Sequence, residues 1–180
     1  MKDHSFFKPI LIFFAVCMTL QFFTGAVLYA VKIGFHPAST LEYYIGSEKM
    51  REKFPDRPDR FMQPRTLEGM MKAAVGHSMG YALIFFILAH LLRSLARQNN
   101  RIERADMVSL VFFIFALCDI FSGFLVRYGP EWTAWIRIAS FLGFELSGVV
   151  VIFAVLSEAA GPVRPGFMLS FLMRERESGM

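Results

Sequence analysis

Four long apolar stretches, separated by polar segments, dominate the hydrophobic pattern of this chain. Two of them contain no charged residue, and the other two contain one each, Asp119 and Glu145. The residues that flank the stretches are Lys8 and Lys32, Lys72 and Arg93, Asp106 and Arg127, and Arg137 and Glu158. The core of a bilayer is about 30 Å thick and requires about 20 apolar helical residues, so each stretch is long enough to cross it.

This pattern predicts an all-α fold, an integral membrane bundle of four transmembrane helices that forms one domain over residues 1–180. We expect the spans at about 9–31, 70–92, 107–127 and 134–157. We also expect an extracytoplasmic loop at 32–69. The tail contains helix-stopping Pro162 and Pro165, and the residues after them combine apolar with charged side chains, which predicts a short C-terminal segment at 163–180 that lies on the membrane surface.

The first loop is expected to be structured. The stretch 41–46 ends at a glycine and predicts a short helix or turn, and Ser47 could cap a second short helix that runs to Phe54. Thr66 is a candidate N-cap for the second span.

Composition supports the membrane class and excludes several others. Hydrophobic residues make up 55% of the 180 residues, and 21 of them are Phe. The net charge is +4, but no basic stripe of the kind that binds nucleic acid is present. The sequence contains no CxxC, P-loop or GxGxxG motif. Cys17 and Cys118 lie within apolar spans, so we expect both to be buried rather than joined in a disulfide.

Orientation is predicted from basic residues near the ends of the spans. The short 93–105 turn carries four arginines, and the amino terminus adds two lysines, which favours a cytoplasmic location for both termini. The first loop is also rich in Lys and Arg and conflicts with this assignment. We give the short turn more weight and expect a bacterial inner membrane protein with both termini inside.

Polar residues inside the spans are the candidate functional residues, because ionisable groups in a bilayer are costly and usually face protein or water. A rise of about 1.5 Å per residue places His77, Asp119 and Gln21 at a similar depth, with Glu145 nearer the middle. These residues could form a polar layer that binds a ligand or moves protons. Alternatively, a His77–Asp119 hydrogen bond could only hold the helices together. Arg137 lies near the end of its span, and we expect its side chain to snorkel to the surface.

Small residues predict close helix contacts. Gly76 and Gly80 bracket His77, and Ala139, Gly143 and Ser147 recur every four residues on the fourth span. The stripe of Met79, Leu83, Phe86 and His90 is expected to serve in packing.

The histidines suggest a haem hypothesis, because neutral imidazole is a common axial ligand of haem iron. Paired by depth, His36 and His77 could hold one haem, and His4 and His90 another. However, the 13 residues between His77 and His90 rotate them by about 220° around a helix. A single haem bound by one of these two histidines and a partner from the first span is easier to build.

Four spans with intramembrane His77 and His90 resemble the small membrane-bound b-type cytochrome subunits, which pass electrons between quinones and partner redox proteins. This resemblance implies haem b and quinone as cofactors. The chain departs from those subunits because its third and fourth spans contain no histidine. The stretches 43–46 and 89–91, together with His77, are also similar to four-span bacterial membrane proteins.

Three functions therefore compete. The first is an electron-transfer subunit that binds haem b, quinone or both and docks to a membrane or periplasmic redox partner. The second is a non-catalytic accessory subunit of a larger membrane complex. The third is a small proton-coupled carrier, although the chain shows no internal repeat. A hydrolytic enzyme is not expected, because the first loop offers His36 but no cysteine.

Overall fold

The computed structural model describes residues 7–98 and 101–159. Within these ranges the chain is helical and has no β-strand. The four long helices are α1 (Phe7–Lys32), α4 (Leu67–Gln98), α5 (Ile102–Tyr128) and α6 (Thr133–Ala159). Each is long and apolar enough to cross a membrane, which confirms the predicted class of a four-span helical bundle.

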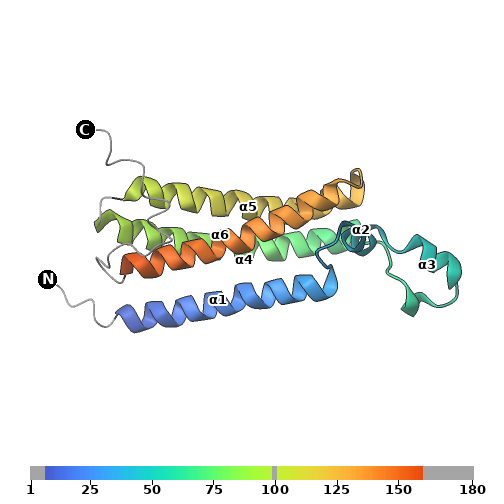
Figure 1. Ribbon diagram of the computed structural model, residues 1–180, viewed down its shortest axis with the longest axis horizontal. Helices are drawn as coiled ribbons and strands as arrows, with labels where there is room; N and C mark the ends of the chain where they lie inside the picture. Colours follow the sequence, from blue (N-terminus) through green and yellow to red (C-terminus); the bar gives the residue numbers. More distant parts are fainter. Residues whose placement is uncertain (1–6, 99–100, 160–180) are drawn as a thin grey trace.

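The four long helices run up and down in an elongated bundle (Figure 1). Three short elements lie at one end of it, which we call the α2 end. They are α2 (Pro37–Ile45), α3 (Glu48–Lys53) and the 3-10 helix η2 (Pro58–Arg60). The opposite end contains the start of α1, the end of α4, the start of α5 and the end of α6 (Figure 1). The predicted interfacial segment at 163–180 lies outside the described residues.

The second span is longer than predicted, since α4 begins at Leu67 and ends at Gln98. The predicted N-cap explains its start, because the Gly69 N–H donates to Thr66 Oγ1 at 3.2 Å. At about 1.5 Å per residue, α4 is about 48 Å long and exceeds the hydrocarbon core of a bilayer.

Helix α6 is the centre of the bundle. It packs most extensively against α5, and it also contacts α4 and α1. Phe144 on α6 stacks on Phe112 of α5 with ring centroids 5.3 Å apart, and Phe22 of α1 lies 5.4 Å from Phe144. A Cβ atom at Gly148 would overlap the ring of Phe22, so this glycine allows α1 to approach α6. Gly143 admits Phe115 of α5 in the same way, as predicted for a small residue on this helix.

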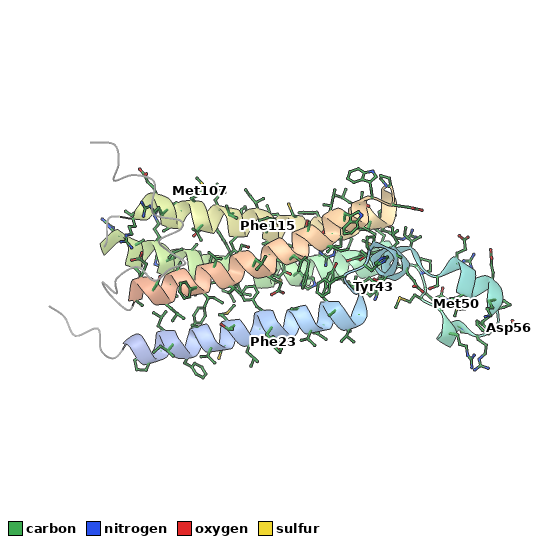
Figure 2. All side chains as sticks on the ribbon, in the orientation of Figure 1. Phe23, Tyr43, Met50, Asp56, Met107 and Phe115 are labelled. Atoms are coloured by element: carbon green, nitrogen blue, oxygen red, sulfur yellow. The ribbon has the colours of Figure 1, made fainter. Side chains whose placement is uncertain are left out.

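Helix α1 packs mainly against α6 and leaves most of its surface exposed. In Figure 2, Phe23 on α1 and Met107 on α5 both point away from the bundle. Their exposed fractions are 65% and 61%, as expected for side chains that face lipid. Cys17 and Cys118 are also exposed, so the prediction that they are buried was wrong. Both lie on lipid-facing sides of their helices.

A second correction concerns the outer face of α4. A Cβ atom added at Gly76 or Gly80 would have no neighbour within 4 Å, so no close helix contact forms there within the described chain. Met79, Leu83 and Phe86 are 72%, 62% and 67% exposed. The predicted packing stripe is therefore a free surface of this chain, because α4 meets α5 and α6 with its other side.

Helix α2 covers the ends of α5 and α6. Tyr44 is buried against Gly123, where a Cβ atom would lie only 3.0 Å from the tyrosine ring. The prediction that the first loop is structured is confirmed by α2 and α3. Ser47 precedes α3 as expected, but its hydroxyl group donates to Glu42 instead of capping the helix.

Candidate functional site

An ion pair between Asp119 of α5 and Arg137 of α6 lies inside the α2 end of the bundle. Asp119 is 5% exposed and Arg137 is 9% exposed. Arg137 Nη1 donates to the Asp119 carboxylate, to the Asp119 carbonyl oxygen at 2.6 Å, and to Ser122 Oγ at 3.3 Å. The expectation that Arg137 snorkels to the surface was wrong. Pairing with Asp119 lowers the cost of keeping its charge among the helices.

Helix α4 joins this ion pair through Tyr81. The Tyr81 hydroxyl group donates to Asp119 Oδ2 at 2.8 Å, and its ring stacks on Phe144 with centroids 4.3 Å apart. Asp119 therefore holds three helices together, as polar groups do between membrane helices. The hydrogen bond considered between His77 and Asp119 is not formed, and His77 instead lies beside the Tyr81 ring, 5.5 Å between centroids.

Two further tyrosines enclose Arg137. Its guanidinium carbon lies 5.4 Å from the centre of the Tyr29 ring, which stacks on Phe141 at 3.9 Å. Tyr44 approaches from α2, outside the membrane-spanning segments. Burial raises the pKa of Tyr44 above its ordinary value, although the charge of Arg137 acts in the opposite direction. Tyr44 therefore stays neutral where it covers the ion pair.

A cavity of about 390 Å³, the α1 cavity, lies on one side of the ion pair, among α1, α4 and α6. Its walls are aromatic and aliphatic on α6 and α4, with polar groups at intervals. Its lining residues include Gln21, Phe22, Thr24, Gly25, Leu28, Tyr29, Lys32, His77, Tyr81, Ile84, Asp119, Arg137, Phe141, Phe144 and Glu145.

A smaller cavity of about 160 Å³, the α2 cavity, lies on the other side, among α2, α4 and α5. Arg65 and Gly69 line it where the first loop meets α4. His77, Asp119 and Arg137 line both cavities. Ile33 and Tyr43 also line both cavities, so these five residues together form the partition between them.

The structure brings four of the residues singled out in the sequence to the α1 cavity. Gln21, His77, Asp119 and Glu145 all line it, each from a different long helix. Glu145 is half-buried, and its carboxyl group makes no hydrogen bond or ion pair within the described residues. Gly25 of α1 provides its space, because a Cβ atom there would lie 3.0 Å from Glu145 Oε1.

The other histidines lie elsewhere. His90 is exposed near the opposite end of α4, about 20 Å from His77 along the helix axis, and stacks on Phe86. His36 is the N-cap of α2, where its Nδ1 accepts from the Ala38 N–H at 3.2 Å. His4 lies outside the described residues.

The positions of the described histidines determine how many of them could bind a haem in either cavity. Of the described histidines, His77 alone lines the α1 or the α2 cavity, so a haem there would have one imidazole ligand from this part of the chain. Within the same residues, no group of three or more His, Cys, Asp or Glu side chains is arranged to hold a metal ion.

Sequence reasoning missed Arg137, Tyr81, Tyr29 and Tyr44 as parts of the site. One signal was available for Arg137, since a lone basic residue inside a span at a depth similar to that of Asp119 suggests an ion pair. Tyr81 follows His77 by one helical turn and so shares its face. The tyrosines of α1 and α2 gave no signal, because their direction depends on how these helices pack.

The fold and the site define an integral membrane protein, a four-helix bundle with a cavity that is lined by apolar and polar groups. A family model described as a transmembrane helical domain, Aq_1264_TM, matches residues 34–163, and the chain belongs to this family. The match begins after α1. Comparisons with curated proteins and with solved structures found no match.

Proposed function

We propose that this chain is a membrane electron-transfer subunit that binds a quinone-class ligand in the α1 cavity. The observation that carries the proposal is a cavity of about 390 Å³ that combines aromatic walls with polar groups supplied by four helices. Small-molecule sites typically measure about 300–1,000 Å³ and are mostly apolar with a few convergent polar groups.

The wall chemistry suits a flat ring with a carbonyl oxygen at each side. Phe22, Phe141 and Phe144 contribute apolar surface to the wall that such a ring can contact. Gln21 of α1 carries a side-chain amide that can donate a hydrogen bond to such an oxygen. Glu145 is free to bond a ligand because it has no hydrogen bond or ion pair within the described residues.

The position of the cavity suits a ligand with an apolar tail. Several of its lining residues, including Gln21, Thr24 and Leu28 of α1, are exposed, so the cavity is open along α1. The cavity therefore reaches the surface that would face lipid. A ligand dissolved in the bilayer could enter between α1 and α4 with its tail remaining outside.

The proposal keeps haem b as a second cofactor, with His77 as the candidate iron ligand, and a redox protein as the partner that exchanges electrons. It places the chain in a bacterial inner membrane with both termini in the cytoplasm. The arginine-rich connection supports this orientation, since Arg93 and Arg101 lie at the end that contains the start of α1 and the end of α6.

Binding of a short-tailed ubiquinone analogue and of menadione to the detergent-purified protein tests the quinone proposal. Gly25→Leu places a side chain beside Glu145 in the cavity, and we expect at least about a tenfold loss of affinity, or about 1.4 kcal/mol. Gly76→Leu is the matched control, because the space outside Gly76 is open, and it should bind as the native protein does. Equal affinity in the two variants, or no binding by the native protein, would reject the proposal.

An absorption spectrum before and after dithionite tests haem b. We expect a Soret band that shifts on reduction in the native protein and is lost in His77→Ala but retained in His90→Ala. A protein without a Soret band, in a folded and haem-supplied preparation, would limit the proposal to quinone.

A second candidate, an accessory subunit of a larger membrane complex, is supported by the free face of α4. Gly76 and Gly80 are uncovered within the described chain, and small residues of this spacing often seat another membrane helix. Under this function, Gly80→Leu would release a co-purifying membrane partner, whereas Gly25→Leu would not. If the Gly80→Leu variant retained every partner, the accessory-subunit function would be rejected.

A further inference from the structure

The lining of the α2 cavity changes from basic to apolar along α4. Arg65 lies two residues before this helix begins, and Gly69 and Ala73 lie about one turn apart within its first two turns. All three residues are exposed, so the cavity is open along this side of α4. Ile120 and Phe124 of α5 line its apolar part. A basic group followed by an apolar surface is the order that a phospholipid requires, with its headgroup first and its acyl chain after it.

Arg65 lies at the level of the lipid headgroups. Arg127, near the end of α5, donates from Nε to the Arg65 carbonyl oxygen at 3.1 Å, which places the two residues side by side. Tyr128, Trp132 and Trp135 follow Arg127 along the chain and are 60%, 62% and 62% exposed. Tryptophan and tyrosine side chains of membrane proteins are enriched at the headgroup level. The phosphate groups of the bilayer therefore lie at the same depth as Arg65.

The side chain of Arg65 is positioned by its neighbours but is not neutralised by them. Its backbone N–H donates to the Tyr44 carbonyl oxygen at 3.0 Å, and its guanidinium carbon lies 4.1 Å from the centre of the Tyr43 ring. It forms no ion pair within the part of the chain that the structure describes. A guanidinium group is planar and can donate to two phosphate oxygens at once. Arg65 can therefore bind a phosphate group without breaking an existing ion pair.

Arg65 also supplies the net charge of the lysine, arginine and acidic side chains that line the cavity. The others are Asp119 and Arg137, whose charges cancel in their ion pair. The Asp119 carboxylate also accepts from the Tyr81 hydroxyl group at 2.8 Å, so it is already occupied. One uncompensated positive charge thus remains where the cavity meets the headgroups, and it favours an anionic group there.

We propose that the α2 cavity binds a phospholipid, with its phosphate group at Arg65 and one acyl chain beside Gly69 and Ala73. These two small residues provide the space, and Ile120 and Phe124 supply apolar contacts for the methylene groups. With a volume of about 160 Å³, the cavity is smaller than sites that enclose a whole ligand, which measure about 300–1,000 Å³. It therefore holds the first part of one chain, and the rest of the lipid stays in the bilayer. The partition separates this lipid from the α1 cavity, so the quinone proposal and the lipid proposal are independent.

Native mass spectrometry of the full-length protein, released from detergent after titration with one lipid at a time, tests the proposal. The probes are dioleoyl phosphatidylglycerol and dioleoylglycerol, which share their acyl chains but differ in the phosphate headgroup. We expect the first phosphatidylglycerol to bind at least about tenfold more tightly than dioleoylglycerol, because only its phosphate can accept charge-assisted hydrogen bonds from Arg65.

Arg65→Gln tests the headgroup contact. It should lower the affinity for phosphatidylglycerol at least about tenfold, toward that of dioleoylglycerol. Arg51→Gln is the matched control, because Arg51 is exposed on α3 and lines neither cavity. Each variant loses one positive charge at an exposed position beside the α2 end, so a difference between them reports the site rather than the net charge.

Ala73→Phe tests the place of the acyl chain. Its ring fills the space beside Gly69 and should also lower the affinity for phosphatidylglycerol at least about tenfold. Ala82→Phe is the matched control, because Ala82 is exposed on the same helix and lines neither cavity. Circular dichroism checks that both variants keep their helices.

The proposal would be overturned if dioleoylglycerol bound as tightly as phosphatidylglycerol, or if the two arginine variants, or the two alanine variants, had equal affinities. Inorganic phosphate is added in a final measurement. We expect it to leave the bound lipid in place at millimolar concentration, because it has no acyl chain. Displacement of the lipid would assign the cavity to a free phosphate ion and would reject the lipid.

Discussion

The two ends of the bundle use charge in different ways. At the α2 end, Asp119 and Arg137 pair inside the protein, beside two cavities. At the opposite end, Arg93 pairs with Asp106 at 3.5 Å and Arg101 with Glu158 at 3.4 Å, with the arginines at the surface. An ion pair is thus inexpensive at one end and requires buried hydrogen-bond partners at the other, because charges inside a bilayer cannot be solvated by bulk water.

Side-chain packing also differs between the two ends of the bundle. Toward the end opposite α2, small and aliphatic residues fill the space, and Leu92, Ala96, Ala105 and Val155 are each 2–4% exposed. At the α2 end, long polar side chains and tyrosines leave the α1 and α2 cavities between them. Tight apolar packing therefore holds one end, and a directional polar network holds the end where we place the function.

The largest expected effect comes from breaking the buried ion pair. Asp119→Leu leaves the charge of Arg137 without its partner and should lower the free energy of unfolding by about 3–5 kcal/mol. Arg93→Gln breaks an exposed pair at the other end and should cost less than about 1 kcal/mol. Unfolding in mixed micelles of increasing SDS fraction measures both. Similar costs for the two variants would contradict the contrast between the ends.

A smaller effect tests how α1 is held. Gly148→Ala places a methyl group against the ring of Phe22 and should cost about 1–3 kcal/mol through overpacking. Gly80→Ala, on the open face of α4, should change the unfolding free energy by less than about 0.5 kcal/mol. The same SDS titration compares them. If Gly148→Ala were neutral, the close packing of α1 against α6 at this glycine would be refuted.

The smallest effect concerns Tyr44 and pH. Its pKa is raised in the folded protein, so above about pH 10 the unfolded chain loses this proton while the folded chain keeps it. Stability is therefore unaffected by this group below about pH 10 and falls as the pH rises toward the folded pKa, by at most about 1.4 kcal/mol per pH unit.

Tyr44→Phe removes this dependence, and the difference between its unfolding curves and those of the native protein isolates the contribution of Tyr44. A variant that loses stability with pH as steeply as the native protein would show that Tyr44 is not held neutral against the ion pair.

The sequence was sufficient for the class and for much of the polar site. Runs of about 20 apolar residues have few alternatives to membrane-spanning helices, and the four predicted spans fall within α1, α4, α5 and α6. Depth along a helix follows from residue number, so the sequence alone assigns Gln21, His77, Asp119 and Glu145 to neighbouring levels.

The direction in which a side chain points around its helix was harder to predict. The outer face of α4 has the Gly76 and Gly80 spacing of a packing interface, yet it is uncovered within the described chain. The prediction for Arg137 failed for a related reason, since a long side chain near a helix end can turn to the surface or to a buried acid.

The sequence by itself therefore determined that this is a four-span membrane protein with polar groups at defined depths, because hydrophobic length and helical rise are properties of each segment alone. Only the tertiary structure decided that Arg137 pairs with Asp119, that Tyr81 joins this pair and that His77 lines two cavities. These features depend on the rotation and spacing of helices relative to one another, which many weak contacts distributed over the whole bundle set together.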